Sequence, residues 1–303
     1  SVIKGVSSLS QASFPQFQNA TNILVQADAV TINNFTLETP NVAAGSYSAL
    51  ITFVGQNFQV TNNTLNSIQG DTAPVGANDS LTNIMIQSIG PGAAPAGNID
   101  GLLVQGNTFT GNGKGYYGVY LNQQGAAVAG TATIDNNQFN GNIWRAISTE
   151  RSNTTITGNT IAPGPETLAA WGGSGIAVRN FTGTTIDNVT ITGNTITTGG
   201  ANGSFANELL LGFADTDPLT DIAISGNTAD INVVGDVLGV TTPAITWSTI
   251  GDVTLSANSS LTAGAGGAVS VTGTGVTNSG TIIAGGGTVT VNAGTGTLTN
   301  TAV

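Results

Sequence analysis

ITGNTI at residues 156–161 is repeated without a change at residues 191–196. Both copies follow one order: apolar, polar, Gly or Asn, Asn, polar, apolar. The same order is found, with similar residues, in VTNNTL (60–65), VQGNTF (104–109), IDNNQF (134–139) and ISGNTA (224–229), and more loosely in TINNFTL (31–37). A phrase that recurs at intervals of about 20 to 50 residues is typical of a solenoid, in which each repeat forms one stacked turn.

Each hexad predicts a sharp corner between two short strands. In the copy at 156–161 we expect Ile156 and Ile161 to point inward and Thr157 and Thr160 to point outward, with a Gly-Asn pair at the bend. Gly and Asn tolerate the left-handed backbone that such a bend requires. Asparagines stacked at one position can also hydrogen-bond through their side-chain amides from turn to turn. The sequence therefore predicts an asparagine ladder of Asn63, Asn107, Asn137, Asn159, Asn194 and Asn227.

The spacing of the fourth hexad position predicts the size of the turns. IMIQSI at 84–89 keeps the apolar positions but has Gln87 in place of the asparagine, and we include it as one repeat. The positions 63, 87, 107, 137, 159, 194 and 227 are then separated by steps of 24, 20, 30, 22, 35 and 33 residues. Steps of 20–24 residues are expected to be bare turns, and the longer steps to carry loops, of which the clearest are 111–118, 163–175 and 197–221. A helical interpretation fails because no i, i+3, i+4 apolar stripe persists and glycine is too frequent.

The hexads resemble the repeats of right-handed parallel β-helix proteins, the pectate-lyase-like superfamily, whose coils often carry an asparagine ladder at one turn. The resemblance covers roughly residues 20–235. It implies an all-β fold, a right-handed parallel β-helix (β-solenoid) of roughly 8–11 coils with loop insertions. We expect an N-terminal cap or assembly segment at 1–20, the β-helix at 21–235, and a charge-poor β-rich continuation at 236–303.

The C-terminal segment differs in composition from the rest of the chain. Residues 253–303 contain no charged residue, no proline and no aromatic residue. Strand-like pieces (VTL 253–255, VSV 269–271, TII 281–283 and VTV 289–291) alternate with Gly-rich corners. This segment resembles the low-charge repeats of very large bacterial surface proteins of the filamentous-haemagglutinin-like kind.

Composition excludes several function classes. The chain has no Cys and no His, which removes Ser-His-Asp and Cys-His nucleophile arrangements and Cys-ligated zinc. Its net charge of −11, with only five basic residues, disfavours nucleic acid and anionic membrane surfaces as partners. No apolar run approaches the roughly 20 residues of a membrane span, so we expect no membrane insertion.

Two groups of residues are candidates for chemistry on sugars. Arg145 and Arg151 flank Glu150 in NIWRAISTERSN (142–153), where Trp144 could stack on a sugar ring. The alternative is a surface ion pair beside a core aromatic. Three tyrosines (Tyr116, Tyr117 and Tyr120) offer either a sugar platform or packing of a loop.

The superfamily's enzymes provide a further test. Pectate lyases use Ca²⁺-binding carboxylates and a basic residue, for which Arg145, Arg151 and Arg179 are the only arginines. Polygalacturonases use a His-containing motif that this chain lacks. No repeated motif marks the two facing carboxylates of a glycoside hydrolase. We therefore predict no catalytic site.

Calcium is the one cofactor that the sequence suggests. In DTDPLTD (215–221), Asp215, Asp217 and Asp221 stand at positions 1, 3 and 7, a spacing that partly resembles a Ca²⁺ loop. The segment lacks the glycine at position 6 and the glutamate at position 12. The alternative is a solvated loop capped by aspartate.

The open ends of a solenoid suggest the function. Each end presents unpaired strand edges, which natural proteins protect with lysine, proline, bulges or caps. The last charged residue is Asp252, so we expect the C-terminal end to bind a second copy head to tail, a contact that does not close and produces fibres. The residues expected to carry this assembly are Val269, Val271, Ile282, Ile283, Val289 and Val291.

Three functions are therefore expected, in this order. The first is an extracellular structural protein that assembles with itself into a bacterial surface filament, tube or appendage. The second is a surface adhesin or passenger segment that binds glycans. The third is a polysaccharide lyase or hydrolase. Because the chain begins at Ser1, we also expect an exported protein whose signal peptide has been removed.

Overall fold

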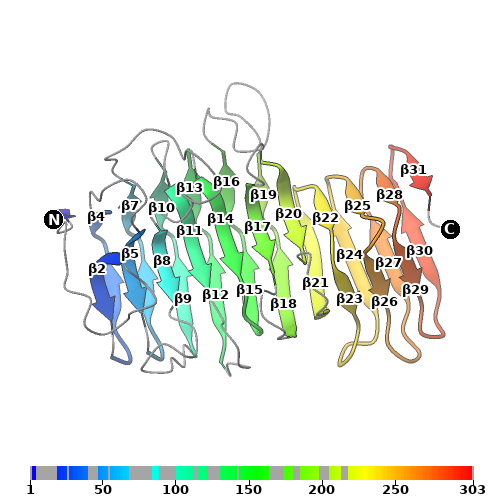
Figure 1. The fold of residues 1–303 in the computed structure, drawn as a ribbon, viewed down its shortest axis with the longest axis horizontal. Helices are drawn as coiled ribbons and strands as arrows, with labels where there is room; N and C mark the ends of the chain where they lie inside the picture. Colours follow the sequence, from blue (N-terminus) through cyan, green and yellow to red (C-terminus); the bar gives the residue numbers. More distant parts are fainter. Residues whose placement is uncertain are drawn as a thin grey trace.

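The chain forms one elongated stack of β-coils. The computed structural model describes residues 2–4, 19–25, 27–39, 47–53, 55–67, 84–88, 100–111, 115–121, 130–141, 143–163, 173–179, 185–197, 205–212 and 218–301. Every regular element in these ranges is a β-strand. The strands follow one another along the long axis from the N-terminal to the C-terminal end (Figure 1).

Three sheets, all with parallel pairing, form the sides of the solenoid. Sheet A contains β1 (Val2–Lys4), β4 (Thr36–Glu38), β7 (Thr64–Asn66), β10 (Thr108–Thr110), β13 (Gln138–Asn140), β16 (Thr160–Ala162) and β19 (Thr195–Ile196). Sheet B contains β2 (Asn19–Val25), β5 (Tyr47–Phe53), β8 (Ile84–Ser88), β11 (Gly115–Leu121), β14 (Ile143–Thr149), β17 (Ser174–Val178), β20 (Asn207–Leu211), β22 (Ile231–Val233), β25 (Val253–Leu255), β28 (Val276–Asn278) and β31 (Leu298–Asn300). Sheet C contains β3 (Thr31–Asn33), β6 (Gln59–Thr61), β9 (Leu102–Gln105), β12 (Ala132–Asp135), β15 (Thr154–Thr157), β18 (Ile186–Thr192), β21 (Leu219–Asn227), β23 (Asp236–Leu238), β24 (Ile245–Thr249), β26 (Ser260–Thr262), β27 (Val269–Thr272), β29 (Thr281–Ile283) and β30 (Val289–Asn292).

Sheet B has eleven strands, one in each successive coil, so the predicted parallel β-helix is confirmed and its coil number lies at the upper limit of the prediction.

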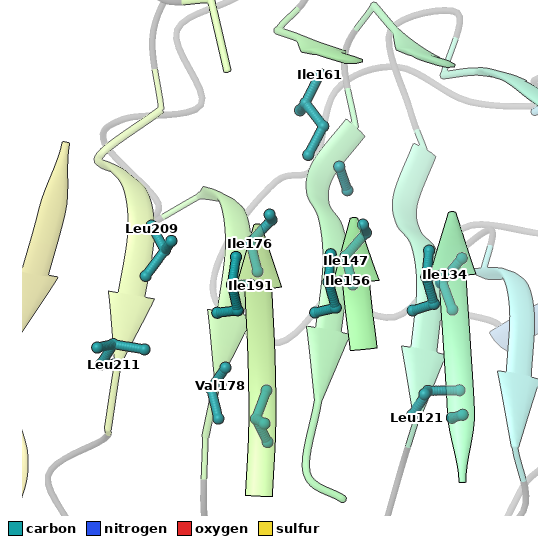
Figure 2. Close-up of a cluster of buried hydrophobic side chains, with 14 of the residues drawn as sticks. Leu121, Ile134, Ile147, Ile156, Ile161, Ile176, Val178, Ile191, Leu209 and Leu211 are labelled. Carbon is teal, nitrogen blue, oxygen red and sulfur yellow. The ribbon is translucent and has the colours of Figure 1, made fainter. Parts of the chain in front are cut away.

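Columns of apolar side chains, one residue from each coil, form the core. The sheet B column consists of Ile23, Ile51, Ile86, Val119, Ile147, Ile176, Leu209, Ile231, Val253, Val276 and Leu298. The sheet C column consists of Ile32, Val60, Val104, Ile134, Ile156, Ile191, Ile224, Trp247, Val271 and Val291. Figure 2 shows the two columns facing each other, with Ile147 and Ile176 on one side and Ile156 and Ile191 on the other. In-register stacking of like residues therefore removes apolar surface from water continuously along the rod.

The hexads form the corners between sheets C and A. Ile156 and Ile161 are completely buried, whereas Thr157 is half-buried and Thr160 exposed, as the sequence predicts. The third hexad residue has a left-handed backbone at every corner, for example Gly158 with a φ of 63°. The full set of these residues is Asn34, Asn62, Gly106, Asn136, Gly158, Gly193 and Gly226. Residues with little cost at positive φ therefore set the bend in each coil.

Sheet B was missed by the hexad pattern, and two predictions are wrong for that reason. Gln87 lies in β8 of sheet B, where its Nε2 donates to Thr52 Oγ1 at 3.0 Å, and not at a corner. The ladder therefore passes directly from Asn63 to Asn107, a step of 44 residues. The expected loops 111–118, 163–175 and 197–221 contain the starts of β11, β17 and β21 and all of β20. Residues of β8 and β17 are buried on both faces, so these strands lack the alternation that marks a strand in sequence.

The coils change their cross-section at β21. Before it, each coil contributes one strand to each of sheets B, C and A, and the last pairing of sheet A is the bridge between Thr195 and Thr228. β21 is nine residues long and pairs with two later strands, through Leu219 to Val237 of β23 and through Ile224 to Trp247 of β24. After β21, each coil contributes one strand to sheet B and two to sheet C. One side of the solenoid thus ends while another begins, and the columns of sheets B and C continue through the change.

Candidate functional site

The asparagine ladder is fully occupied by bonds within the chain. Along the ladder from Asn63 to Asn227, the Nδ2 of each asparagine donates to the Oδ1 of the next asparagine at 2.9–3.1 Å. The backbone N–H of the same donating asparagine also donates to that Oδ1, at 2.9–3.0 Å. Each Nδ2 also donates, at 2.8–3.0 Å, to a carbonyl oxygen of the preceding coil. At the N-terminal end, Asn63 Oδ1 accepts the N–H of Phe35 at 2.9 Å. All six side chains are buried, so the ladder supports the fold and does not face a ligand.

An aromatic cluster on the strands of sheet B is separate from the main core. Tyr117 packs with Ala49 and Ile84, and Tyr120 and Trp144 pack against them. The two tyrosine rings stack with centroids 4.5 Å apart, and Trp144 meets Tyr117 edge-on at 5.8 Å. Tyr117 is 4% exposed, which leaves no open ring face for a sugar. Tyr116 also lies in β11, but its side chain is outside the described part of the structure.

The arginine and the glutamate suggested by the sequence join this cluster. The guanidinium of Arg145 lies 3.6 Å from the ring centroid of Trp144, and its Nη1 donates to the Tyr117 hydroxyl at 3.2 Å. The Tyr120 hydroxyl donates to Glu150 Oε1 at 2.9 Å. Arg145 and Glu150 are both buried, so the expected surface ion pair is wrong about exposure.

The electrostatics of the cluster favour neutral tyrosines. Burial raises the pKa of Tyr117, and the nearby Arg145 opposes this shift. Burial, followed by the charge of Glu150, raises the pKa of Tyr120 well above its usual value. Both hydroxyls therefore act as hydrogen-bonding groups at ordinary pH. Glu150 brings a carboxylate to this cluster through the Tyr120 hydroxyl.

Arg151 is separate from this cluster and has an unusual environment. It is 1% exposed, and among the described residues its Nε, Nη1 and Nη2 have no hydrogen-bond partner. Burial lowers its pKa to about 10. Its backbone is well held, because its N–H donates to Thr149 Oγ1 at 3.1 Å and its carbonyl oxygen accepts from Thr154 Oγ1 at 3.1 Å. Arg179, the third arginine, is buried at the end of β17.

Asp221 has a defined partner within the chain. Its two carboxylate oxygens accept the backbone N–H groups of Val240, Thr241 and Thr242 at 2.8–3.0 Å. Burial raises the pKa of Asp221, but these bonds together outweigh it, so the net shift of the pKa is downward. Asp215 and Asp217, the other expected calcium ligands, lie outside the described residues. In the described ranges, no group of three or more acidic side chains could hold a metal ion. Asp221 thus fixes the loop that leads from β23 to β24.

The end of the last described coil presents an open strand edge. Two bonds join β31 to β28: the Val276 N–H donates to the Thr297 carbonyl, and the Thr301 N–H donates to the Asn278 carbonyl. Because backbone groups alternate in direction along a strand, those of Leu298 and Asn300 point away from β28. The same alternation in β30 and β29 directs the backbone groups of Val289, Val291 and Ile282 to this edge. Among the described residues, β29, β30 and β31 each pair on one side only.

The expected assembly residues divide into two groups at this edge. Ile283, Val289 and Leu298 are 48%, 48% and 54% exposed, and Leu298 was missed by the sequence analysis. Ile282 and Val291 are half-buried and pack against the core. Val269 and Val271 are completely buried in β27, one coil before the edge, and are therefore not exposed at it.

Comparisons with protein-family models, with curated proteins and with solved structures gave no match. No helix long and apolar enough to cross a membrane occurs in the part of the chain that the structure describes.

Proposed function

We propose that this chain is a structural subunit that assembles end to end with further copies of itself into a filament at a bacterial surface. The observation that carries the proposal is the open, uncharged edge formed by β29, β30 and β31. Unpaired strand edges are templates for further pairing, and proteins that remain monomeric usually protect them with charge, proline or a cap. This edge instead combines free backbone groups with exposed Ile283, Val289 and Leu298.

The opposite end offers the complementary surface. Among the residues that the structure describes, β1, β2 and β3 each pair on one side only, with β4, β5 and β6 respectively. Contact between unlike ends of identical molecules does not close, and it continues into a fibre. The absence of charge after Asp252 means that no like-charge repulsion opposes the contact on the C-terminal side.

The likeness of the hexads to the pectate-lyase-like superfamily and of the tail to large surface proteins is consistent with an extracellular setting. A surface adhesin or passenger segment is the second candidate. It is favoured by the regularity of the last coils, whose sheet B strands begin at 231, 253, 276 and 298, because further coils of one longer chain could continue this spacing.

The test is electron microscopy with sedimentation over a concentration series, using two matched variants. Leu298→Lys places a charge at the edge, and Val240→Lys places the same charge at an equally exposed apolar residue away from it. We expect rods longer than one subunit for the wild type and Val240→Lys, and single subunits for Leu298→Lys. Single rods of the wild type at every concentration would contradict assembly and favour the adhesin.

A further inference from the structure

In an end-to-end joint, the last residues of the sheet B and sheet C columns of one copy must stack on the first residues of the same columns of the next copy. At the C-terminal end the sheet B column stops at Leu298, 54% exposed, and the sheet C column stops at the half-buried Val291. At the N-terminal end the same columns start at Ile23, which is half-buried, and Ile32, which is 8% exposed. Every other member of each column is covered by a residue of the same column on both sides.

On the basis of the assembly proposed above, we propose that the joint is in register, with Leu298 of one copy stacked on Ile23 of the next and Val291 on Ile32. In this arrangement β31 pairs with β2 and β30 pairs with β3. Both apolar columns then continue across the joint without a break. A shift by one residue would place polar side chains of one copy on the apolar column of the other, since neighbouring residues point to opposite faces.

The direction of the strands is compatible with this joint. All pairings in sheets B and C are parallel, and within the described part of the chain β2 and β31 are the two end strands of sheet B, with their unpaired edges at opposite ends of one axis. Moving one copy along that axis therefore brings the two edges together with parallel polarity. The strands would meet at the usual separation of about 4.8 Å, as they do within each copy.

The third side of the solenoid changes at the joint, and the chain already contains such a change. Sheet C has an additional column that begins at Ile186 and ends at Ile282, whereas the strands of sheet A begin again at β1. Within the chain the additional column begins at Ile186 in β18 and sheet A ends at the bridge between Thr195 and Thr228, while the columns of sheets B and C continue. At the joint, the additional column of one copy would end and sheet A of the next copy would begin, which is the reverse of the change within the chain.

The register predicts which outward residues become neighbours. Leu24 follows Ile23 and Thr299 follows Leu298, so these two meet on the outer face of sheet B. Asn33 follows Ile32 and Asn292 follows Val291, so these two meet on the outer face of sheet C. All four side chains are exposed, and none is charged.

The test uses cysteine pairs in a chain that has no cysteine of its own. The in-register pairs are Leu24→Cys with Thr299→Cys, and Asn33→Cys with Asn292→Cys. The crossed pairs, Leu24→Cys with Asn292→Cys and Asn33→Cys with Thr299→Cys, contain the same four substitutions. The two sites of each pair are separated by ten strand spacings in sheet B and nine in sheet C, which at about 4.8 Å each is more than roughly 40 Å. A disulfide between these sites therefore joins different copies.

Each double variant is oxidised mildly and analysed on a non-reducing gel, with circular dichroism to verify folding and electron microscopy to count rods. We expect a ladder of multimers for the in-register pairs, about tenfold more abundant than for the crossed pairs, because disulfides tolerate only a narrow range of Cα separations. Elongated rods without this preference would overturn the register and leave the assembly standing. Isolated single rods without multimers would overturn both.

Discussion

The corners of the coils before β21 and those of the coils after it use different chemistry. Before β21, a left-handed Gly or Asn makes the bend, and a buried asparagine ties each coil to the next through its amide. After β21 the ladder stops at Asn227, and the following corner uses Thr249, whose Oγ1 donates to the Asn227 carbonyl at 3.1 Å. Corners between β23 and β24 and their successors rely on glycine, since a Cβ on Gly264 would lie 2.5 Å from the Gly239 carbonyl oxygen.

A corner can therefore be stabilised either by side-chain hydrogen bonds between coils or by close approach of the backbones of two coils. The ladder adds side-chain hydrogen bonds in a buried site, where an unmade bond is costly. Glycine offers no side-chain bond at its corners, but it lets the backbones of successive coils approach more closely than a Cβ allows. The first half should therefore be sensitive to loss of polar atoms and the second to gain of volume.

The largest expected effect is in the ladder. Asn159→Ala leaves the N–H of Asn137 and the carbonyl of Ile134 without their partners, and we expect a loss of about 3–5 kcal/mol in the free energy of unfolding. Asn278→Ala, in the second half, removes one bond to Asn300 and one from the Gly280 N–H and should cost about 1 kcal/mol. Chemical denaturation followed by circular dichroism measures both, and equal losses would remove the distinction between the halves.

The glycine corners give the next effect. Gly264→Ala forces the new Cβ against a backbone carbonyl, and we expect a loss of about 2–3 kcal/mol. Gly141→Ala is the control in the first half, because Gly141 has a positive φ of 65° and open space around its Cβ position. Its cost should be the backbone strain alone, about 1 kcal/mol. A control that destabilises as much as Gly264→Ala in thermal unfolding would show that close approach is not what these corners require.

Arg151 is expected to oppose the stability of the first half. Its guanidinium is buried without a hydrogen-bond partner among the described residues, and replacement of such a charge by an apolar side chain is often stabilising. We expect Arg151→Met to raise the free energy of unfolding by about 1–3 kcal/mol at pH 7.

The pH dependence of this effect has a defined sign. Burial lowers the folded-state pKa of Arg151 to about 10, below its ordinary value, so above this pH the unfolded chain holds the proton more tightly than the folded chain. The advantage of Arg151→Met is therefore constant below pH 10 and shrinks as the pH rises above it. Denaturation of both proteins at pH 7, 9 and 11 measures the difference, and Lys114→Met serves as the control for loss of a positive charge. A destabilised Arg151→Met at pH 7 contradicts the prediction.

The smallest effect is expected at Asp221, where the two halves meet. Asp221→Ala removes three bonds to the 240–242 loop, but the site is partly exposed, so we expect a loss of about 1 kcal/mol. The folded-state pKa is lowered below 3.8, so the contribution is present above that pH and is lost as the pH falls through the folded-state value. Denaturation at pH 7 and pH 2.5 measures this, and Asp221→Asn, which keeps one acceptor oxygen, should lie between the two proteins.

The corners could be predicted from sequence because one short phrase encodes both the bend and the stack. Ile156, Gly158 and Asn159 are adjacent, and each has a single physical role. Sheet B could not be predicted in the same way, since β8 and β17 are buried on both faces and lack the alternation of a half-buried strand. The hand of the coil stays a prediction.

The candidate site was harder to predict, because its properties arise from partners distant in sequence. Tyr117, Trp144 and Arg145 are recognisable as a sugar-binding combination, but their burial depends on neighbouring coils. In the sequence Asp221 resembles a calcium ligand, but in the structure its carboxylate accepts backbone N–H groups from residues about 20 positions later in the chain. The sequence does indicate an unprotected C-terminal edge, since charge is absent there, but not which residues of that edge are covered.

The change in corner chemistry at β21 also determines how the rod responds to force. Hydrogen bonds between coils lie along the solenoid axis, so tension on the two ends peels one coil at a time and does not shear whole sheets. The coils after Asn227 lack the ladder bonds, so we expect them to open first, with each coil of about 22 residues releasing up to about 75 Å of chain. The ladder coils open at higher load. The molecule is therefore a graded spring, with its compliant section at the C-terminal side.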